Sequence, residues 1–169
     1  MERTPVMTGG CQCGAIRYAM FGELDQPHIC HCRMCQKAVG GLFSALAANA
    51  DQEFVVTRGA IATFRSSDLV ERGFCADCGT PLTFRYLGSG RTNVSIGSMD
   101  EASCVVPEFQ MGIEARMPWF GDLPSLYELT TEAAAEHSGH QEEIAAVART
   151  NHQHPDHDTA DWPVRNENR

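Results

Sequence analysis

Positive charge and long apolar runs are both scarce in this chain of 169 residues. Its 13 basic side chains, among which Lys37 is the lone lysine, are outnumbered by 22 acidic ones, and the formal net charge is −9. The arginines are scattered and form no basic run. Since phosphate backbones repel an acidic chain that lacks a basic patch, we expect no nucleic acid among its partners.

Apolar segments long enough for a membrane are missing too. No run approaches the roughly 20 residues of a spanning helix, and residues 1–10 lack the basic region and the apolar stretch of a signal peptide. We therefore expect no membrane partner and a cytoplasmic location. Thiols stay reduced there, so the eight cysteines indicate metal ligands rather than disulfides.

Short strand-like segments separated by glycines fill the chain from about residue 10 to residue 130. Residues 15–21 alternate in polarity with period 2, which is typical of a half-buried strand. The other segments of this kind are residues 54–57, 61–64, 69–74, 81–86 and 93–96. Strands this short predict a mainly β protein built from antiparallel sheets. Arg58 and Gly59 are predicted to turn a hairpin between the second and third of these segments.

Two helices are predicted. One covers residues 33–39, because the double glycine at Gly40 and Gly41 would end it. The other begins near Ser138, which has with Gln141 the spacing of a capping box. Both are short, so neither changes the mainly β class.

The composition changes after residue 130. Alanine and glutamate dominate at first, and from residue 151 onward the chain is polar and nearly empty of core residues. Such a composition predicts disorder. We therefore expect a folded domain over residues 1–130 and a helical, then disordered, tail over residues 131–169.

Four cysteines occur in two short motifs, each followed by glycine. Cys11 and Cys13 form the first, and Cys75 and Cys78 the second. A structural zinc takes four soft ligands in a tetrahedron, which thiolates at about 2.3 Å satisfy. Each motif supplies two ligands, so a closed site requires both. The alternative is two reduced, buried cysteine pairs without metal.

A second set of cysteines, Cys30, Cys32 and Cys35, lies within six residues. Three protein ligands and one vacant position are the arrangement of a reactive zinc site. His31 is an alternative fourth ligand, but adjacent side chains in an extended segment point to opposite faces, so we expect it to face away. Three thiolates and one Zn²⁺ together have a net charge of −1, and one coordination position stays open. We therefore expect zinc to occupy this site only partly. A metal-free thiol redox site is the competing interpretation.

Other polar or reactive side chains carry weaker signals. We expect Cys104 to be a buried apolar residue. Arg33, Arg65 and Arg72 are candidates to pair with an anionic ligand, although a solvated surface arginine is the expectation for each. The tail histidines are expected to be solvated, and they are His137, His140, His152, His154 and His157.

These motifs together resemble the glutathione-dependent formaldehyde-activating enzymes and their relatives, a family that includes centromere protein V. The resemblance runs in register from about residue 8 to residue 127. Its motifs are GCQCGAIRY at residues 10–18, CHCRMCQ at 30–36, GAIATFRSS at 59–67, RGFCADCGT at 72–80, VSIGSMD at 94–100 and DLP at 122–124. The extension beyond about residue 130 departs from the family.

The resemblance implies a β-tent fold, in which small antiparallel sheets lean together around zinc over residues 1–130. It also implies two zinc ions with different roles. Cys11, Cys13, Cys75 and Cys78 match the structural ligands. Cys30, Cys32 and Cys35 match the ligands of the catalytic zinc.

The resemblance further implies a reaction that joins the glutathione thiol to formaldehyde, giving S-hydroxymethylglutathione. A thiol entering the vacant zinc position becomes a thiolate near neutral pH and attacks the aldehyde carbon. We therefore expect a zinc-dependent carbon–sulfur lyase whose partners are a small-molecule thiol and an aldehyde, either this pair or a related one. Two alternatives stay open: a non-catalytic zinc-binding interaction module and a thiol redox sensor.

Overall fold

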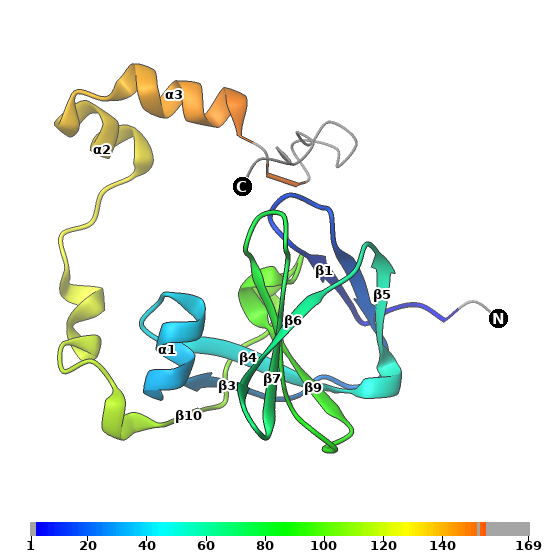
Figure 1. The fold of residues 1–169 in the computed structure, drawn as a ribbon. Helices are drawn as coiled ribbons and strands as arrows, with labels where there is room; N and C mark the ends of the chain where they lie inside the picture. The colour runs from blue at the N-terminus through cyan, green and yellow to red at the C-terminus, as the bar shows by residue number, and fades with distance from the viewer. Residues whose placement is uncertain (1–2, 152, 155–169) are drawn as a thin grey trace.

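Short β-strands make up two sheets in the computed structural model, which describes residues 3–151 and 153–154. The strands are β1 (Met7–Gly10), β2 (Arg17–Met20), β3 (Asp25–Cys30), β4 (Ser44–Ala50), β5 (Phe54–Arg58), β6 (Ala62–Ser67), β7 (Val70–Phe74), β8 (Pro81–Tyr86), β9 (Arg91–Ser95) and β10 (Phe109–Met111). One sheet has the order β1-β2-β5, and the other has the order β10-β3-β4-β9-β8-β7-β6 (Figure 1). The predicted mainly β class with small antiparallel sheets is confirmed, and among the strands of the described residues only β10 pairs in parallel, with β3.

The predicted hairpin at Arg58 and Gly59 is wrong. The chain does turn at Gly59, whose φ is +69°, but β5 pairs with β2 whereas β6 pairs with β7. The two strands therefore belong to different sheets. Side-chain packing explains the choice, because the ring of Phe54 lies 5.2 Å from that of the buried Tyr18 on β2. That contact holds β5 against the small sheet.

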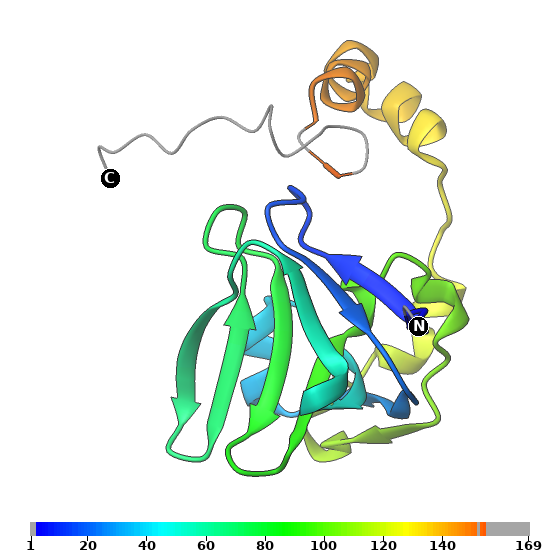
Figure 2. The same ribbon diagram turned by 90° about the vertical axis from the view of Figure 1, so that its right-hand side faces the viewer.

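The core lies between the two sheets (Figure 2). Met20, Leu82 and Val94 are fully buried there, and each such side chain contributes roughly 1.5–3 kcal/mol relative to an exposed position. Tyr18 is buried with them and shares a hydrogen bond of 2.8 Å with the Ser98 hydroxyl. Burial raises the pKa of the Tyr18 phenol well above its usual value, so it stays neutral. The core thus ties β2 to the chain that follows β9.

The helix α1 (Arg33–Val39) has the predicted limits. It begins after Cys32, whose Sγ accepts a hydrogen bond from the backbone N–H of Cys35 at 3.4 Å. It ends at Gly40, which takes the left-handed conformation with φ +65°. One member of the second cysteine set therefore caps the start of this helix, and a glycine ends it.

Two helices follow the β domain, α2 (Thr131–Ser138) and α3 (Gln141–Thr150), and they lie apart from the sheets (Figure 1). The capping-box prediction is wrong, because Ser138 is the last residue of α2 and its hydroxyl donates to the Ala135 carbonyl. Gly139 then reverses the chain with φ +72°. The predicted disorder concerns mainly residue 152 and residues 155–169, which lie outside the described part of the chain. Among the helices of the described part, none has the length and apolar character needed to cross a membrane.

Candidate metal centres and the adjoining pocket

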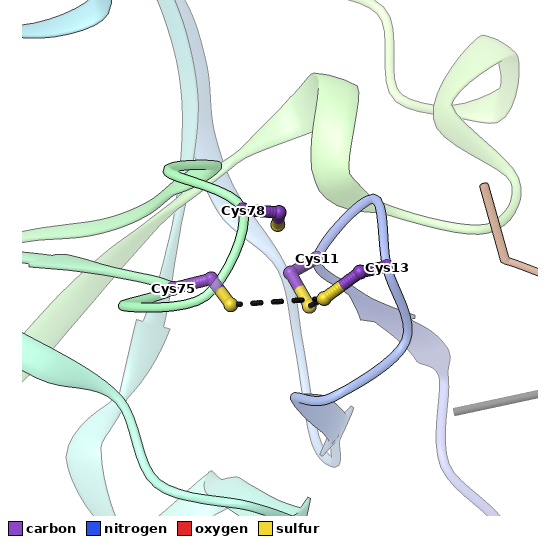
Figure 3. A group of neighbouring side chains, drawn as sticks. All are labelled: Cys11, Cys13, Cys75 and Cys78. Atoms are coloured by element: carbon purple, nitrogen blue, oxygen red, sulfur yellow. Dashed lines mark hydrogen bonds between the residues drawn. The ribbon is translucent and has the colours of Figure 1, made fainter. Parts of the chain in front are cut away.

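The first cysteine cluster joins the two sheets. Cys11 and Cys13 lie in the loop after β1, and Cys75 and Cys78 lie in the loop between β7 and β8. Their four sulfurs lie within 4.8 Å of one another (Figure 3). The sulfurs of Cys11 and Cys13 are 3.5 Å apart, and those of Cys13 and Cys75 are 3.9 Å apart. A tetrahedral zinc with Zn–S bonds of about 2.3 Å requires about 3.8 Å, so the donor set fits this metal.

Each loop is closed by a glycine in the left-handed conformation. Gly14 has φ +76°, and its N–H donates to the Cys11 carbonyl at 3.1 Å. Gly79 has φ +81°, and its N–H donates to the Cys75 carbonyl at 2.9 Å. Other residues are strained at such φ values, so the glycine after each motif is what allows both sulfurs to face one point.

The thiols of this cluster differ in their readiness to ionise. Burial raises the pKa of Cys75 to about 11, and it raises that of Cys13 still further. Burial acts on Cys78 in the same direction, but hydrogen bonds led by the one with the Thr80 hydroxyl, at 3.1 Å, lower its pKa to about 6. Buried sulfurs this close repel one another as thiolates. A divalent cation at their centre would remove that repulsion.

The second cluster comprises Cys30 at the end of β3, Cys32 before α1 and Cys35 in its first turn. Their sulfurs lie within 4.8 Å of one another. Cys30 and Cys35 are buried, whereas Cys32 is partly exposed. Burial raises the pKa of Cys30 to about 12. It opposes ionisation of Cys32 as well, but the hydrogen bond from the Cys35 N–H and those with the neighbouring thiols lower that pKa. Three soft donors around one point fit zinc with an open position.

His31 lies away from these three thiols, as the alternation of an extended segment predicts. It is fully buried, and its Nε2 lies 2.8 Å from Oε1 of Gln110 on β10. Its ring packs edge-on against Phe43 and Phe120, with centroids 5.8 and 4.8 Å away. In the described part of the chain, the groups able to hold a metal comprise the seven cysteines and do not include His31.

A cavity of about 780 Å³ opens beside the second cluster, and all three of its cysteines line the wall. Phe84 and Tyr86 from β8 and Phe109 and Met111 from β10 supply apolar surface to the wall, and polar side chains such as Asn93 also line it. The short parallel strand β10 therefore builds one side of the pocket. No sequence pattern predicted this strand, because three residues are too few to show a period.

Arg72 on β7 is the cluster-contacting residue that sequence reasoning placed wrongly. It was expected on the surface, but only 6% of it is exposed, and its Nη2 donates to Sγ of Cys35 at 3.4 Å. Its guanidinium also lies 4.8 Å from the centre of the Phe84 ring and donates to the Ser66 hydroxyl. The signal was the period of 2, which puts Arg72 on the same face as the buried Val70.

A comparison with protein families matches residues 6–114 to the family described as glutathione-dependent formaldehyde-activating enzyme. The matched range contains both cysteine clusters. The chain belongs to this family. The resemblance stated on the motifs is thereby confirmed at family level.

Two individual proteins resemble this family member. An uncharacterized lyase of Schizosaccharomyces pombe is 32% identical over 82 residues, and the match covers 48% of this chain and 59% of that protein. The chain thus spans little more than half the length of this relative. A crystal structure of a Rhodobacter sphaeroides protein has a TM-score of 0.50 at 18% identity, covering 62% of this chain and all of that one. Likeness at that identity supports the fold alone.

The other polar or reactive residues singled out in the sequence of this family member lie outside both clusters. Cys104 is exposed, so its predicted burial is wrong, because it ends a surface 3₁₀ turn over Ala102–Cys104. Arg33 and Arg65 are exposed, as expected. The tail histidines differ in their surroundings: His137 and His140 are exposed, His154 is partly buried, and His152 and His157 lie outside the described residues.

Proposed function

We propose that the chain is a zinc-dependent carbon–sulfur lyase that joins a thiol to an aldehyde at Cys30, Cys32 and Cys35. Family membership supports this proposal, and the S. pombe relative is itself named a lyase. The observation that carries the proposal is the contrast between the two clusters. One has four cysteines, whereas the other has three and lines a cavity of about 780 Å³. A closed set suits a structural ion, and an open set beside a cavity suits a reactive one.

In this proposal Cys11, Cys13, Cys75 and Cys78 hold a structural zinc, and the three-cysteine cluster holds a catalytic one. The catalytic zinc would supply an open coordination position that stabilises a thiol substrate as its thiolate near neutral pH. Arg72 adds a positive charge next to Cys35, which offsets the excess negative charge of three thiolates around one divalent cation. Its buried position also keeps that charge poorly screened by solvent.

Glutathione and formaldehyde are the first substrate pair to test, with S-hydroxymethylglutathione or a related adduct as product. The thiolate sulfur attacks the carbonyl carbon, a carbon–sulfur bond forms, and the electron pair of the C=O bond moves to oxygen. That oxygen takes up a proton equivalent to the one that the thiol lost, so the reaction is balanced without an oxidant. We also propose a cytoplasmic location, where such thiols are reduced.

The test is to purify the protein without oxygen, count zinc per chain, and measure by NMR the exchange among formaldehyde, glutathione and adduct. We expect an acceleration over the uncatalysed rate that is lost in Cys32→Ala. Cys104→Ala is the matched control, since Cys104 is exposed and belongs to neither cluster. No acceleration in protein that holds two zinc ions would contradict the formaldehyde reaction.

A thiol redox sensor is the second candidate, favoured by three features of Cys32. Cys32 is partly exposed, its pKa is lowered, and two further sulfurs lie within 4.8 Å. Mild peroxide treatment would then form a disulfide in this cluster and release its metal. Retention of both metal and free thiols under conditions that oxidise Cys104 would exclude this function.

A further inference from the structure

Polar side chains line the three-cysteine pocket alongside its aromatic ones. Apart from the arginines and the cysteines, they are Gln26, His28, Ser67, Ser89, Asn93 and Glu114. A ligand that fills this cavity therefore meets hydrogen-bonding groups as well as apolar surface. The groups that have no partner within the protein are the ones free to bind that ligand.

Most of the polar groups of the wall already have partners. Nδ1 of His28 lies 2.8 Å from a backbone carbonyl oxygen. The hydroxyls of Ser67 and Ser89 bond to backbone groups of nearby residues. Both arginines of the wall are engaged as well, one with Cys35 and the other with Asp25. Within the part of the chain that the structure describes, the polar side chains of the wall that have no partner are those of Gln26, Asn93 and Glu114.

Asn93 differs from the other two in its burial. Gln26 and Glu114 are exposed, whereas Asn93 is partly buried on β9, in the interior of the larger sheet. A carboxamide that a ligand covers loses its bonds to water, and leaving it unpaired then costs free energy. Asn93 is therefore the residue of the three that most restricts which ligand can fill the pocket.

The place of Asn93 in the sheet brings it near the cysteine cluster. Asn93 on β9 is the register partner of Phe84 on β8, which is in turn the register partner of Arg72 on β7. Such partners have Cβ atoms about 4.5–5.5 Å apart. The three side chains form one row along the cavity wall, and the guanidinium of Arg72 at its end bonds to Sγ of Cys35. A ligand whose sulfur reaches the cluster thus extends over Asn93.

The chemistry of a carboxamide matches the main chain of a peptide. It offers one acceptor oxygen and two donor hydrogens. In an extended peptide, the N–H and C=O of one residue point to the same side, as they do in the hydrogen-bonded pairs of an antiparallel sheet. The cysteinyl residue of glutathione has such an N–H and such a C=O beside its thiol. One carboxamide can accept from the first and donate to the second.

We propose that Asn93 binds the N–H and C=O of the cysteinyl residue in a thiol peptide such as glutathione. The inference rests on the proposed function and assigns a residue that selects the thiol substrate of that site. The row from Asn93 to Arg72 then directs the sulfur toward the three cysteines. Small thiols without a peptide group leave Asn93 unpaired, so the pocket holds a thiol peptide more tightly.

Binding is measured with Co²⁺ in place of zinc, because a thiol that enters an open cobalt site changes the visible absorption bands. The titrants are glutathione and 2-mercaptoethanol, which has a thiol but no peptide group. Asn93→Leu keeps the volume of the side chain and removes its hydrogen-bonding atoms. We expect it to weaken glutathione binding about tenfold, since two hydrogen bonds are lost, and to leave 2-mercaptoethanol binding unchanged.

Two further variants separate hydrogen bonding from other causes. Asn93→Ala should give about the same loss for glutathione, and it excludes obstruction of the pocket by the leucine. It also decides the matter if Asn93→Leu fails to fold. Asn151→Leu is the matched control, because it makes the same change outside the cavity, and it should alter neither affinity.

The outcomes distinguish this inference from the function on which it rests. Unchanged glutathione affinity in the variants of Asn93, or an equal loss for both thiols, would overturn the inference and leave the proposed function standing. If neither thiol changed the absorption bands of the unaltered protein, the proposed function would fall with it.

Discussion

Arg72 shows how one side chain sets the electrostatics of a cysteine cluster. Three thiolates and one divalent cation together carry a net charge of −1, and the guanidinium donates to one of the three sulfurs at 3.4 Å. Charge-assisted hydrogen bonds of this kind are worth roughly 1.5–3 kcal/mol. The aromatic ring of Phe84 beneath the guanidinium fixes its position.

We therefore expect Arg72→Gln to weaken zinc binding at the three-cysteine cluster by about tenfold or more. Arg72→Lys should restore part of the loss, because it keeps the charge but not the stacking or the bond to Ser66. Competition with a chromophoric chelator measures both. Arg65→Gln is the control, since Arg65 is exposed on the neighbouring strand. Zinc affinity that Arg72→Gln leaves unchanged would show that the guanidinium has no effect on the metal.

Gly112 packs closely against the backbone of Cys32. Its φ is +66°, and a Cβ there would lie 2.6 Å from the backbone nitrogen of Cys32 and 3.0 Å from its Cβ. Gly112→Ala should therefore displace Cys32 and release the metal of that cluster. Gly88→Ala is the matched control, because Gly88 has φ +76° with nothing within 4 Å of the added Cβ.

Alanine is strained by about 1 kcal/mol in the left-handed conformation. Both variants should therefore lose about that much free energy of unfolding. Only Gly112→Ala should lower the zinc content, from two ions to one per chain. Equal zinc content in the two variants would mean that the backbone around Cys32 yields without moving its sulfur.

At the scale of elements, the four-cysteine cluster links the loop after β1 in one sheet to the loop between β7 and β8 in the other. These loops are more than sixty residues apart in the sequence. Bringing them together therefore costs conformational entropy, which a cross-link offsets. Structural zinc contributes about 10–16 kcal/mol in small zinc-binding peptides. That is comparable to the whole stability of most domains, about 5–15 kcal/mol.

Cys75→Ala should consequently unfold or aggregate the protein, because it leaves three thiols, of which Cys11 and Cys13 are buried, without the ion that joins the sheets. Near-ultraviolet circular dichroism and zinc content measure the outcome. Cys35→Ala is the informative comparison, since it removes a buried thiol from the other cluster and should lower zinc content while leaving the sheets folded. A folded Cys75→Ala protein with unchanged metal would refute the structural role of the four-cysteine cluster.

Asp100 links the segment that follows β9 to the small sheet by charge and hydrogen bonds. It accepts hydrogen bonds from Thr8 on β1 and from Arg17 on β2, both at 2.5 Å. Partial burial acts to raise its pKa, but these bonds prevail and hold it below the ordinary value of 3.8. A carboxylate with a lowered pKa stabilises the fold fully above its ordinary value, and the effect is lost only as the pH falls below it.

Asp100→Asn should therefore lower the free energy of unfolding by about 1 kcal/mol, a value reduced for the partial exposure of this pair. The loss should be the same at about pH 6 and about pH 8, as chemical denaturation would show. Asp68→Asn, in an exposed turn, should have no comparable effect. A loss that changed between those pH values would place the responsible titration in another group.

For the whole molecule, the sequence predicted features that neighbouring residues determine, and it missed features that depend on contacts between distant residues. The three-cysteine group and the limits of α1 follow from residues close together in the sequence, such as Cys32 and Gly40, so spacing predicted them. The meeting of the two distant motifs of the four-cysteine group was instead inferred from the four ligands that a closed zinc site requires. The sheet to which β5 belongs depends on the packing of Phe54 on Tyr18, thirty-six residues earlier. The burial of Arg72 likewise depends on Phe84 from another strand. Such contacts leave no local pattern, and the pocket that Arg72 and Phe84 help to line was not predicted.

The predicted division after residue 130 is the last expectation at this scale, and truncation tests it. All seven clustered cysteines precede that residue. In the described part, α2 and α3 pack on each other, and the tail returns to the β domain through the N–H of His154, which donates to the Gln12 carbonyl at 2.6 Å. One such hydrogen bond is worth about 0.5–1.5 kcal/mol, which corresponds to a shift of roughly 1–6 °C in Tm for a chain of this size.

Residues 1–130 alone should therefore fold, bind two zinc ions and melt within that range of the full chain. Calorimetry of the two zinc-loaded proteins measures this difference in Tm. A variant that lacks only residues 152–169 loses the hydrogen bond of His154 but keeps α2 and α3. It should show most of the shift in Tm. If instead removal of α2 and α3 caused aggregation or loss of zinc, the tail would be part of the folded domain, and the boundary at residue 130 would be wrong.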